Sequence, residues 1–142
     1  MMDAYREFVH RSIVWVRYLR RIKSVKYTVF ACLLLLMLLG AKVATIPLKF
    51  PEGLQLNDKV IHLIVFFGFA LIADVVTSRE PFWLWKGLPL VAYGFGIEVL
   101  QYFSPDRSFS LLDGLADALG VLLYWLIKQL VYIVEQKRSQ LS

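Results

Sequence analysis

The sequence predicts an all-α membrane protein, in which a bundle of four transmembrane helices follows a basic, amphipathic N-terminal helix. Hydrophobic residues make up 58% of the 142 residues and aromatic residues 15%, and the mean hydropathy is +0.60. These values are too apolar for a soluble domain of this size. Four segments also approach the roughly 20 residues that span about 30 Å of hydrocarbon. They are residues 27–46, 60–76, 82–103 and 111–130.

Three regions follow from this pattern. Residues 1–26 form a cytoplasmic basic segment, residues 27–134 the four-helix membrane domain, and residues 135–142 a cytoplasmic tail. In the first region, apolar side chains recur at helical spacing on one face and basic side chains on another. The apolar set is Tyr5, Val9, Ile13 and Val16, and the basic set is Arg6, His10, Arg17 and Arg21. We expect an interfacial helix attracted to anionic lipids, the alternative being a basic tail that only sets the orientation.

The first apolar segment is expected to be a retained anchor. A cleaved signal peptide would have a shorter leader than the about 26 residues found here, and a small residue three positions before the cleavage site. Lys42 stands at that position relative to Ala44. Cys32 is the sole cysteine, so cysteine builds neither a disulfide nor a zinc site.

The other three segments carry signs of membrane packing. The second segment is short, and it reaches the length of a membrane span only if the Lys59 side chain extends toward the interface and Asp74 is tolerated near the other end of the segment. Small residues in the third and fourth segments favour close helix approach. They are Gly94, Gly96, Gly114 and Gly120. Tryptophans near the inner ends are typical of an interfacial aromatic belt. They are Trp83, Trp85 and Trp125.

Basic residues set the topology. Seven of the sixteen Lys and Arg residues precede Tyr27, so the positive-inside rule places the N-terminus in the cytoplasm. Four spans return the C-terminus to the same side. The outer loops then hold only Lys42, Lys49, Lys59 and Arg107. The net charge of +5 is therefore explained by topology, and no nucleic-acid partner is expected.

Polar residues collect where three predicted helices meet the outer face. An ionisable group inside a membrane segment costs about 2.5–3.5 kcal/mol on insertion scales, so such a collection indicates a site. Asp58 and His62, and likewise Asp113 and Asp117, share helix faces at a spacing of four residues. The candidate binding residues are Asp58, Lys59, His62, Glu98, Gln101, Arg107, Asp113 and Asp117.

Each candidate also has a structural explanation. Asp58 fits a helix N-cap, and Ser110 with Asp113 fits a capping box. Arg107 fits a solvated loop charge or a contact to lipid phosphate. His62, Glu98 and Asp117 lie deeper, where hydrogen bonds between helices are worth about 0.6–2 kcal/mol. The sequence has no zinc-protease, serine-hydrolase or phosphate-loop motif, and on this basis we assign no metal and no cofactor.

Three sequence runs resemble the VanZ-like family of small bacterial membrane proteins. They are DKVIH (residues 58–62), EVLQYFSPDRS (residues 98–108) and SLLD (residues 110–113). The similarity covers about residues 39–128, and the family usually has asparagine at the position of Asp117. The resemblance implies a multi-pass protein of the bacterial cytoplasmic membrane. Because the founding member is associated with teicoplanin resistance, it also implies a role at the cell surface.

Three functions remain in competition. In the first, Arg107 and Lys59 bind phosphate or carboxylate of a cell-envelope amphiphile (a lipid, a glycolipid or a lipid-linked precursor). In the second, the protein is a hydrolase or transferase for a lipid-linked phosphate, and His62 acts as base or metal ligand. Its candidate catalytic residues are His62, Glu98, Asp113 and Asp117. In the third, the bundle is a structural subunit, and a homo-oligomer or a membrane-protein partner stays open.

Overall fold

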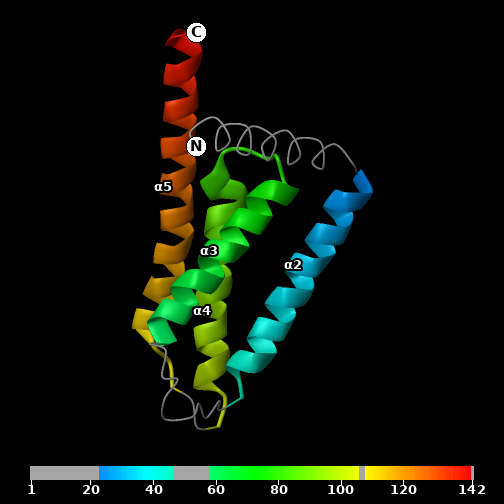
Figure 1. Cartoon of the computed structure of the whole chain (residues 1–142). Coiled ribbons are helices and arrows are strands. Elements are labelled where there is room, and N and C mark those ends of the chain that lie inside the picture. Colours follow the sequence, from blue (N-terminus) through cyan, green and yellow to red (C-terminus); the bar gives the residue numbers. More distant parts are fainter. Residues whose placement is uncertain (1–22, 47–57, 106–107, 142) are drawn as a thin grey trace, which may run out of the picture.

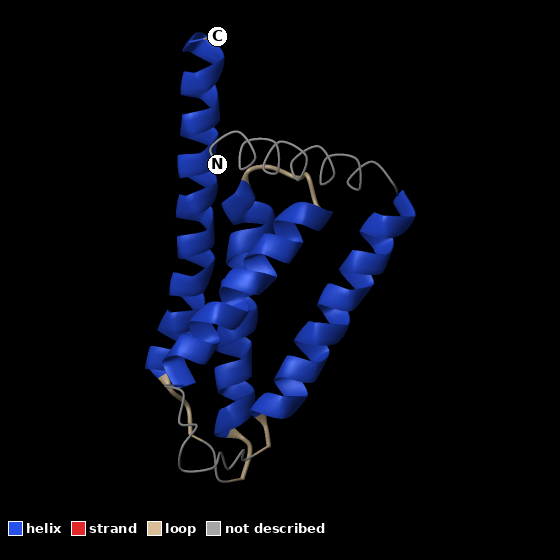
Figure 2. Cartoon of the chain, in the orientation of Figure 1, coloured by secondary structure: helices blue, strands red, loops and turns tan. Residues whose placement is uncertain are grey.

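A computed structural model describes residues 23–46, 58–105 and 108–141, and this part of the chain is helical apart from short connecting loops and contains no strand (Figures 1 and 2). The helices, in chain order, are α2 (Lys23–Ala44), α3 (Asp58–Val76), the π-helical turn η1 (Trp83–Gly87), α4 (Leu88–Tyr102) and α5 (Leu111–Leu141). The predicted N-terminal amphipathic helix and the loop residue Arg107 lie outside the described residues.

Three of these helices are long and apolar enough to cross a membrane. They are Ser24–Ala44 within α2, Asp58–Val76 and Leu111–Lys137 within α5. They coincide with three of the four predicted segments, so the prediction of an all-α chain is confirmed for the described residues, and three of the four predicted spans have the length and hydropathy to cross a membrane. The helix α5 continues to Leu141 through most of the predicted tail, and it projects past the other helices (Figure 1).

The predicted third segment differs from a regular helix. It begins with the π turn η1, in which the N–H of Leu88 donates to the carbonyl of Trp83, and only then continues as α4. Pro89 stands in the first turn of α4 and has no N–H with which to continue an α-helical ladder back to Trp85. Gly87 accommodates the turn, because an added Cβ would lie 2.4 Å from the Trp83 ring.

The helices α3 and α5 make the closest backbone approach. A Cβ added at Gly120 of α5 would lie 2.3 Å from the carbonyl oxygen of Leu63, so only glycine fits there. Gly114 similarly lies under the ring of Phe95, whereas a Cβ at Gly96 would meet nothing within 4 Å among the described residues. A Cβ at Gly94 would lie 2.6 Å from Oδ2 of Asp117. The expected packing role is therefore found at Gly94, Gly114 and Gly120 and is absent at Gly96.

A small, partly aromatic core holds the helices together, and much of the remaining surface consists of exposed apolar side chains. Phe66, Ala70 and Val121 are buried in this core. On α2, by contrast, Leu33 is the only one of six leucines that is buried, and Leu38 reaches 69% exposure. Exposed leucines along a helix that is apolar all round are typical of a membrane span. The hydroxyl of Tyr93 donates to the carbonyl of Met37 and so attaches α4 to α2.

The helices alternate in direction, which brings their ends together in two groups. The end of α2, the start of α3, the end of α4 and the start of α5 lie at one end of the molecule, the lower end in Figure 1. The start of α2, the end of α3 and the turn η1 lie at the opposite end (Figure 1). Residues far apart in sequence are thereby collected at each end.

Candidate functional site

Most of the predicted site residues meet at the lower end of the molecule, where α3 and α5 begin and α4 ends. We call this group the histidine cluster. It consists of Asp58, Lys59, His62, Glu98, Asp113 and Asp117. The alternating helix directions produce it, since each helix contributes residues from its last or first turns. Arg107 lies outside the described residues, and its place relative to the cluster stays a prediction.

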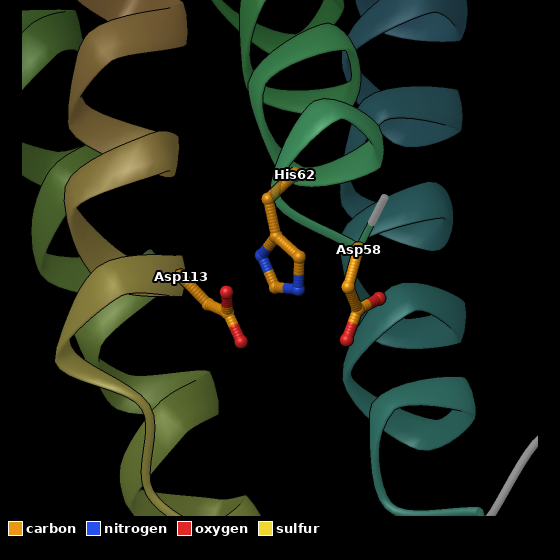
Figure 3. A group of neighbouring side chains, drawn as sticks. All are labelled: Asp58, His62 and Asp113. Atoms are coloured by element: carbon orange, nitrogen blue, oxygen red, sulfur yellow. The ribbon is translucent and has the colours of Figure 1, made fainter. Parts of the chain in front are cut away.

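An imidazole lies at the centre of this cluster. The Nδ1 atom of His62 is 2.8 Å from Oδ1 of Asp117, which joins α3 to α5. The ring lies between the carboxylates of Asp58 and Asp113 (Figure 3), and these three residues offer one ligand atom each within a mutual distance of 4.8 Å. Asp117 is fully buried at 0% exposure, so its carboxylate fixes the orientation of the imidazole from the interior side.

The start of α5 combines capping with contacts to the other helices. The backbone N–H of Asp113 donates to Oγ of Ser110 at 3.3 Å, which is the first half of the predicted capping box. The second half is supplied from another helix, because Oε2 of Glu98 accepts the N–H of Ser110 at 2.9 Å. The Asp113 side chain is thus left to face Lys59, whose Nζ lies 3.4 Å from Oδ1 of Asp113.

Two predicted site residues on α4 have roles between helices. Glu98 is fully buried at 0% exposure, and besides Ser110 it experiences the charges of Asp113, His62 and Asp117. Gln101 faces α2 instead, where its Nε2 donates to the carbonyl of Ala44 at 3.1 Å. Of the two, only Glu98 therefore belongs to the histidine cluster.

The cluster is rich in acceptors and poor in donors. It contains four carboxylates against one lysine and one histidine. Three buried carboxylate oxygens accept no hydrogen bond from any residue that the structure describes. They are Oε1 of Glu98, Oδ1 of Asp113 and Oδ2 of Asp117. A buried acceptor without a partner costs about 1–3 kcal/mol, so the arrangement favours a ligand that donates hydrogen bonds or carries positive charge.

A second polar group, at the opposite end, was not expected from the sequence. We call it the lysine network, and it consists of Asp74, Glu80, Lys86, Tyr124 and Lys128. Lys86 is almost completely buried at 2% exposure, and its Nζ donates to Oδ1 of Asp74 at 2.6 Å. The hydroxyl of Tyr124 donates to Oδ2 of Asp74 at 2.8 Å, and Lys128 reaches Oδ1 at 3.1 Å.

Glu80 closes the lysine network from the loop after α3. Its Oε1 accepts from Lys128 at 2.9 Å and from Lys86 at 3.3 Å. Desolvation acts to raise the pKa of Glu80, but the hydrogen bonds and charges of the two lysines outweigh it and lower this pKa below its ordinary value. From the sequence, Asp74 is expected only as a charge tolerated near the far end of its span. The signal that points to the lysine network is the rule that buried charges are paired, with Lys86 and Lys128 as the available partners.

Comparison of the chain with protein-family models, with curated proteins and with solved structures finds no match. The resemblance to the VanZ-like family therefore stays an expectation from the three sequence runs.

Proposed function

We propose that this chain is a four-span protein of the bacterial cytoplasmic membrane, of the VanZ-like type, whose histidine cluster binds the head group of a cell-envelope amphiphile. In this proposal η1 and α4 together form the third span in chain order and complete the set of four. They cover residues 83–102, a helical path of about 30 Å at about 1.5 Å per residue. The ligand is a lipid, a glycolipid or a lipid-linked precursor.

The three buried carboxylate oxygens that accept no hydrogen bond from the described residues carry this proposal. They belong to Glu98, Asp113 and Asp117, and they lie at one end of the molecule beside a half-exposed lysine. Hydroxyl and amine groups of a sugar head group would donate to such oxygens. Lys59, whose side chain is 44% exposed, would meet a phosphate or carboxylate at the rim, with Arg107 as the second predicted cation.

The distribution of charge supports an outward-facing site. Arg79, Lys86 and Lys128 lie near the end opposite to the histidine cluster, together with the start of α2. The basic N-terminal residues precede that start. By the positive-inside rule this end faces the cytoplasm, and the histidine cluster then faces the cell surface. An effect on susceptibility to teicoplanin would follow if the ligand is a surface precursor.

One observation favours a second candidate function, catalysis at a lipid-linked phosphate. A histidine held by a buried aspartate, as His62 is held by Asp117 at 2.8 Å, is an arrangement that orients a general base. A hydrolase or transferase would use it on the same ligand class. A third candidate, a structural subunit, is favoured by two hydrogen bonds between helix ends: the N–H of Ser110 donates to Glu98, and the side chain of Gln101 donates to the carbonyl of Ala44.

The test is native mass spectrometry of the protein extracted gently with its bound lipids. Wild type is compared with a Lys59→Ala, Arg107→Ala double variant, and a Lys137→Ala, Arg138→Ala double variant in the last turns of α5 serves as the charge-matched control. We expect a lipid species that is retained by wild type and the control and lost from the double variant. Identical bound lipids in all three proteins would contradict the proposal, and a double variant that is merely less stable would favour the structural role.

A further inference from the structure

We propose that Asp58, His62 and Asp113 form a binding site for a divalent transition-metal ion. The three side chains come from the first turns of α3 and α5, and they offer ligand atoms within 4.8 Å of one another (Figure 3). Donors on one tetrahedral metal lie about 3.4 Å apart, given bond lengths of about 2.0–2.2 Å. Binding of one ion therefore requires the set to close to that spacing, and Asp58, which is exposed, is the member with room to rotate.

His62 is oriented as a metal ligand would be. Its Nδ1 forms a hydrogen bond with Oδ1 of the buried Asp117 at 2.8 Å, so Nε2 is the ring nitrogen that can bind a metal ion. Histidines that bind metals generally donate their other ring N–H to a carboxylate, which fixes the tautomer and makes the ligand more basic. Asp117 is thus a positioning residue for His62.

Asp113 provides the independent observation that points to a cation. It is only 8% exposed, and its Oδ1 accepts no hydrogen bond from the described residues. The ammonium group of Lys59 lies 3.4 Å from this oxygen without hydrogen-bond geometry. A metal ion between Asp113 and His62 would satisfy the oxygen directly. Lys59 is then the competitor that the metal displaces from the Asp113 carboxylate.

The donor set indicates which ion binds. Imidazole suits zinc, and carboxylate suits manganese as well, whereas magnesium and calcium prefer oxygen ligands throughout. One nitrogen with two carboxylates therefore favours Zn²⁺ or Mn²⁺, and three protein ligands leave a position open for an outside oxygen. Such an ion would also give the acidic cluster the positive charge that an anionic head group requires. The inference concerns the ion alone and stands whether or not an amphiphile binds.

The test measures Zn²⁺ and Mn²⁺ binding to the full chain, purified in detergent with an affinity tag that contains no histidine. Isothermal titration calorimetry gives the affinity, and elemental analysis after dialysis gives the metal content. We expect about one ion per chain in wild type, loss of binding in His62→Ala, and a 10–100-fold weaker Kd in Asp117→Asn. Lys59→Met should bind more tightly than wild type, because the competing ammonium is gone.

Two further variants keep the test decisive. His10→Ala changes the one other histidine of the chain and should bind as wild type does. If His62→Ala fails to fold, Asp58→Asn decides, since Asp58 is exposed at the start of α3 and its loss should weaken binding at an unchanged melting temperature. Wild type that binds neither ion at micromolar concentration, or equal binding by wild type and the folded site variants, would overturn the inference.

Discussion

Replacing Asp74 by asparagine should destabilise the protein strongly, because it removes the main counter-ion of a buried lysine. Lys86 is 2% exposed, and its ammonium group donates to Asp74 at 2.6 Å and to Glu80 at 3.3 Å. Removing one partner of a buried ion pair costs about 3–5 kcal/mol. Since asparagine preserves the shape and Glu80 remains, we expect the lower end of this range, about 3 kcal/mol.

Replacing the lysine of this pair instead of the aspartate should destabilise the protein less. In Lys86→Met, Asp74 still accepts from Tyr124 at 2.8 Å and from Lys128 at 3.1 Å, so no charge is left alone. The Asp74→Asn, Lys86→Met double variant should be more stable than Asp74→Asn, because the uncompensated ammonium group has been replaced by an apolar side chain.

Unfolding in mixed micelles of increasing denaturing detergent, followed by tryptophan fluorescence, measures these differences. Glu135→Gln is the control, since it removes one carboxylate charge from an exposed position of α5. The reasoning would be refuted if Asp74→Asn unfolded at the same detergent fraction as Glu135→Gln. It would also fail if adding Lys86→Met made Asp74→Asn still less stable.

Two further predictions concern packing and pH. Gly120→Ala places a Cβ 2.3 Å from the carbonyl oxygen of Leu63 and should lower the free energy of unfolding by about 1–3 kcal/mol through overpacking. The control Gly96→Ala, whose Cβ meets nothing within 4 Å among the described residues, should leave the melting temperature nearly unchanged. Equal melting temperatures of the two variants would contradict the close packing at Gly120. The pKa of Glu80 is lowered from its ordinary value of 4.5, so its stabilisation is present above that pH and is lost as the pH falls through the lower folded-state pKa. Wild-type melting temperature should therefore fall more steeply below pH 4.5 than that of Glu80→Gln, and parallel curves would contradict the role of Lys128 and Lys86 as its partners.

The membrane helices could be predicted because hydrophobic length is a property of the sequence alone. The segments at residues 24–44, 58–76 and 111–137 need no knowledge of their neighbours. The meeting of Asp58, His62, Asp113 and Asp117 also follows from sequence, because alternating spans return successive helix ends to the same face. The Ser110 cap was predictable for the same reason, since capping depends on residues close in the chain.

Contacts between residues far apart in the sequence could not be predicted from hydrophobic length or helix ends. The pairs of Asp74 with Tyr124 and Lys128 span 50 and 54 residues, and a helix that is apolar all round gives no signal of which face meets a partner. Gln101 was assigned to the site although it faces α2, because its helix end alone could not specify its direction. The π turn depends on the missing N–H of Pro89, and hydrophobic length alone does not indicate how a proline alters the preceding turn.

The proposed function requires that the histidine cluster open on the external side of the membrane. The most direct measurement is labelling of single cysteines in intact cells with a membrane-impermeant maleimide, in a Cys32→Ala background. Ser108→Cys, beside the cluster, should react in intact cells, and Ser78→Cys, at the opposite end, only after permeabilisation. Both serines are exposed, so the comparison is matched. Labelling of Ser78→Cys alone in intact cells would place the cluster in the cytoplasm and contradict its proposed role in binding an envelope ligand.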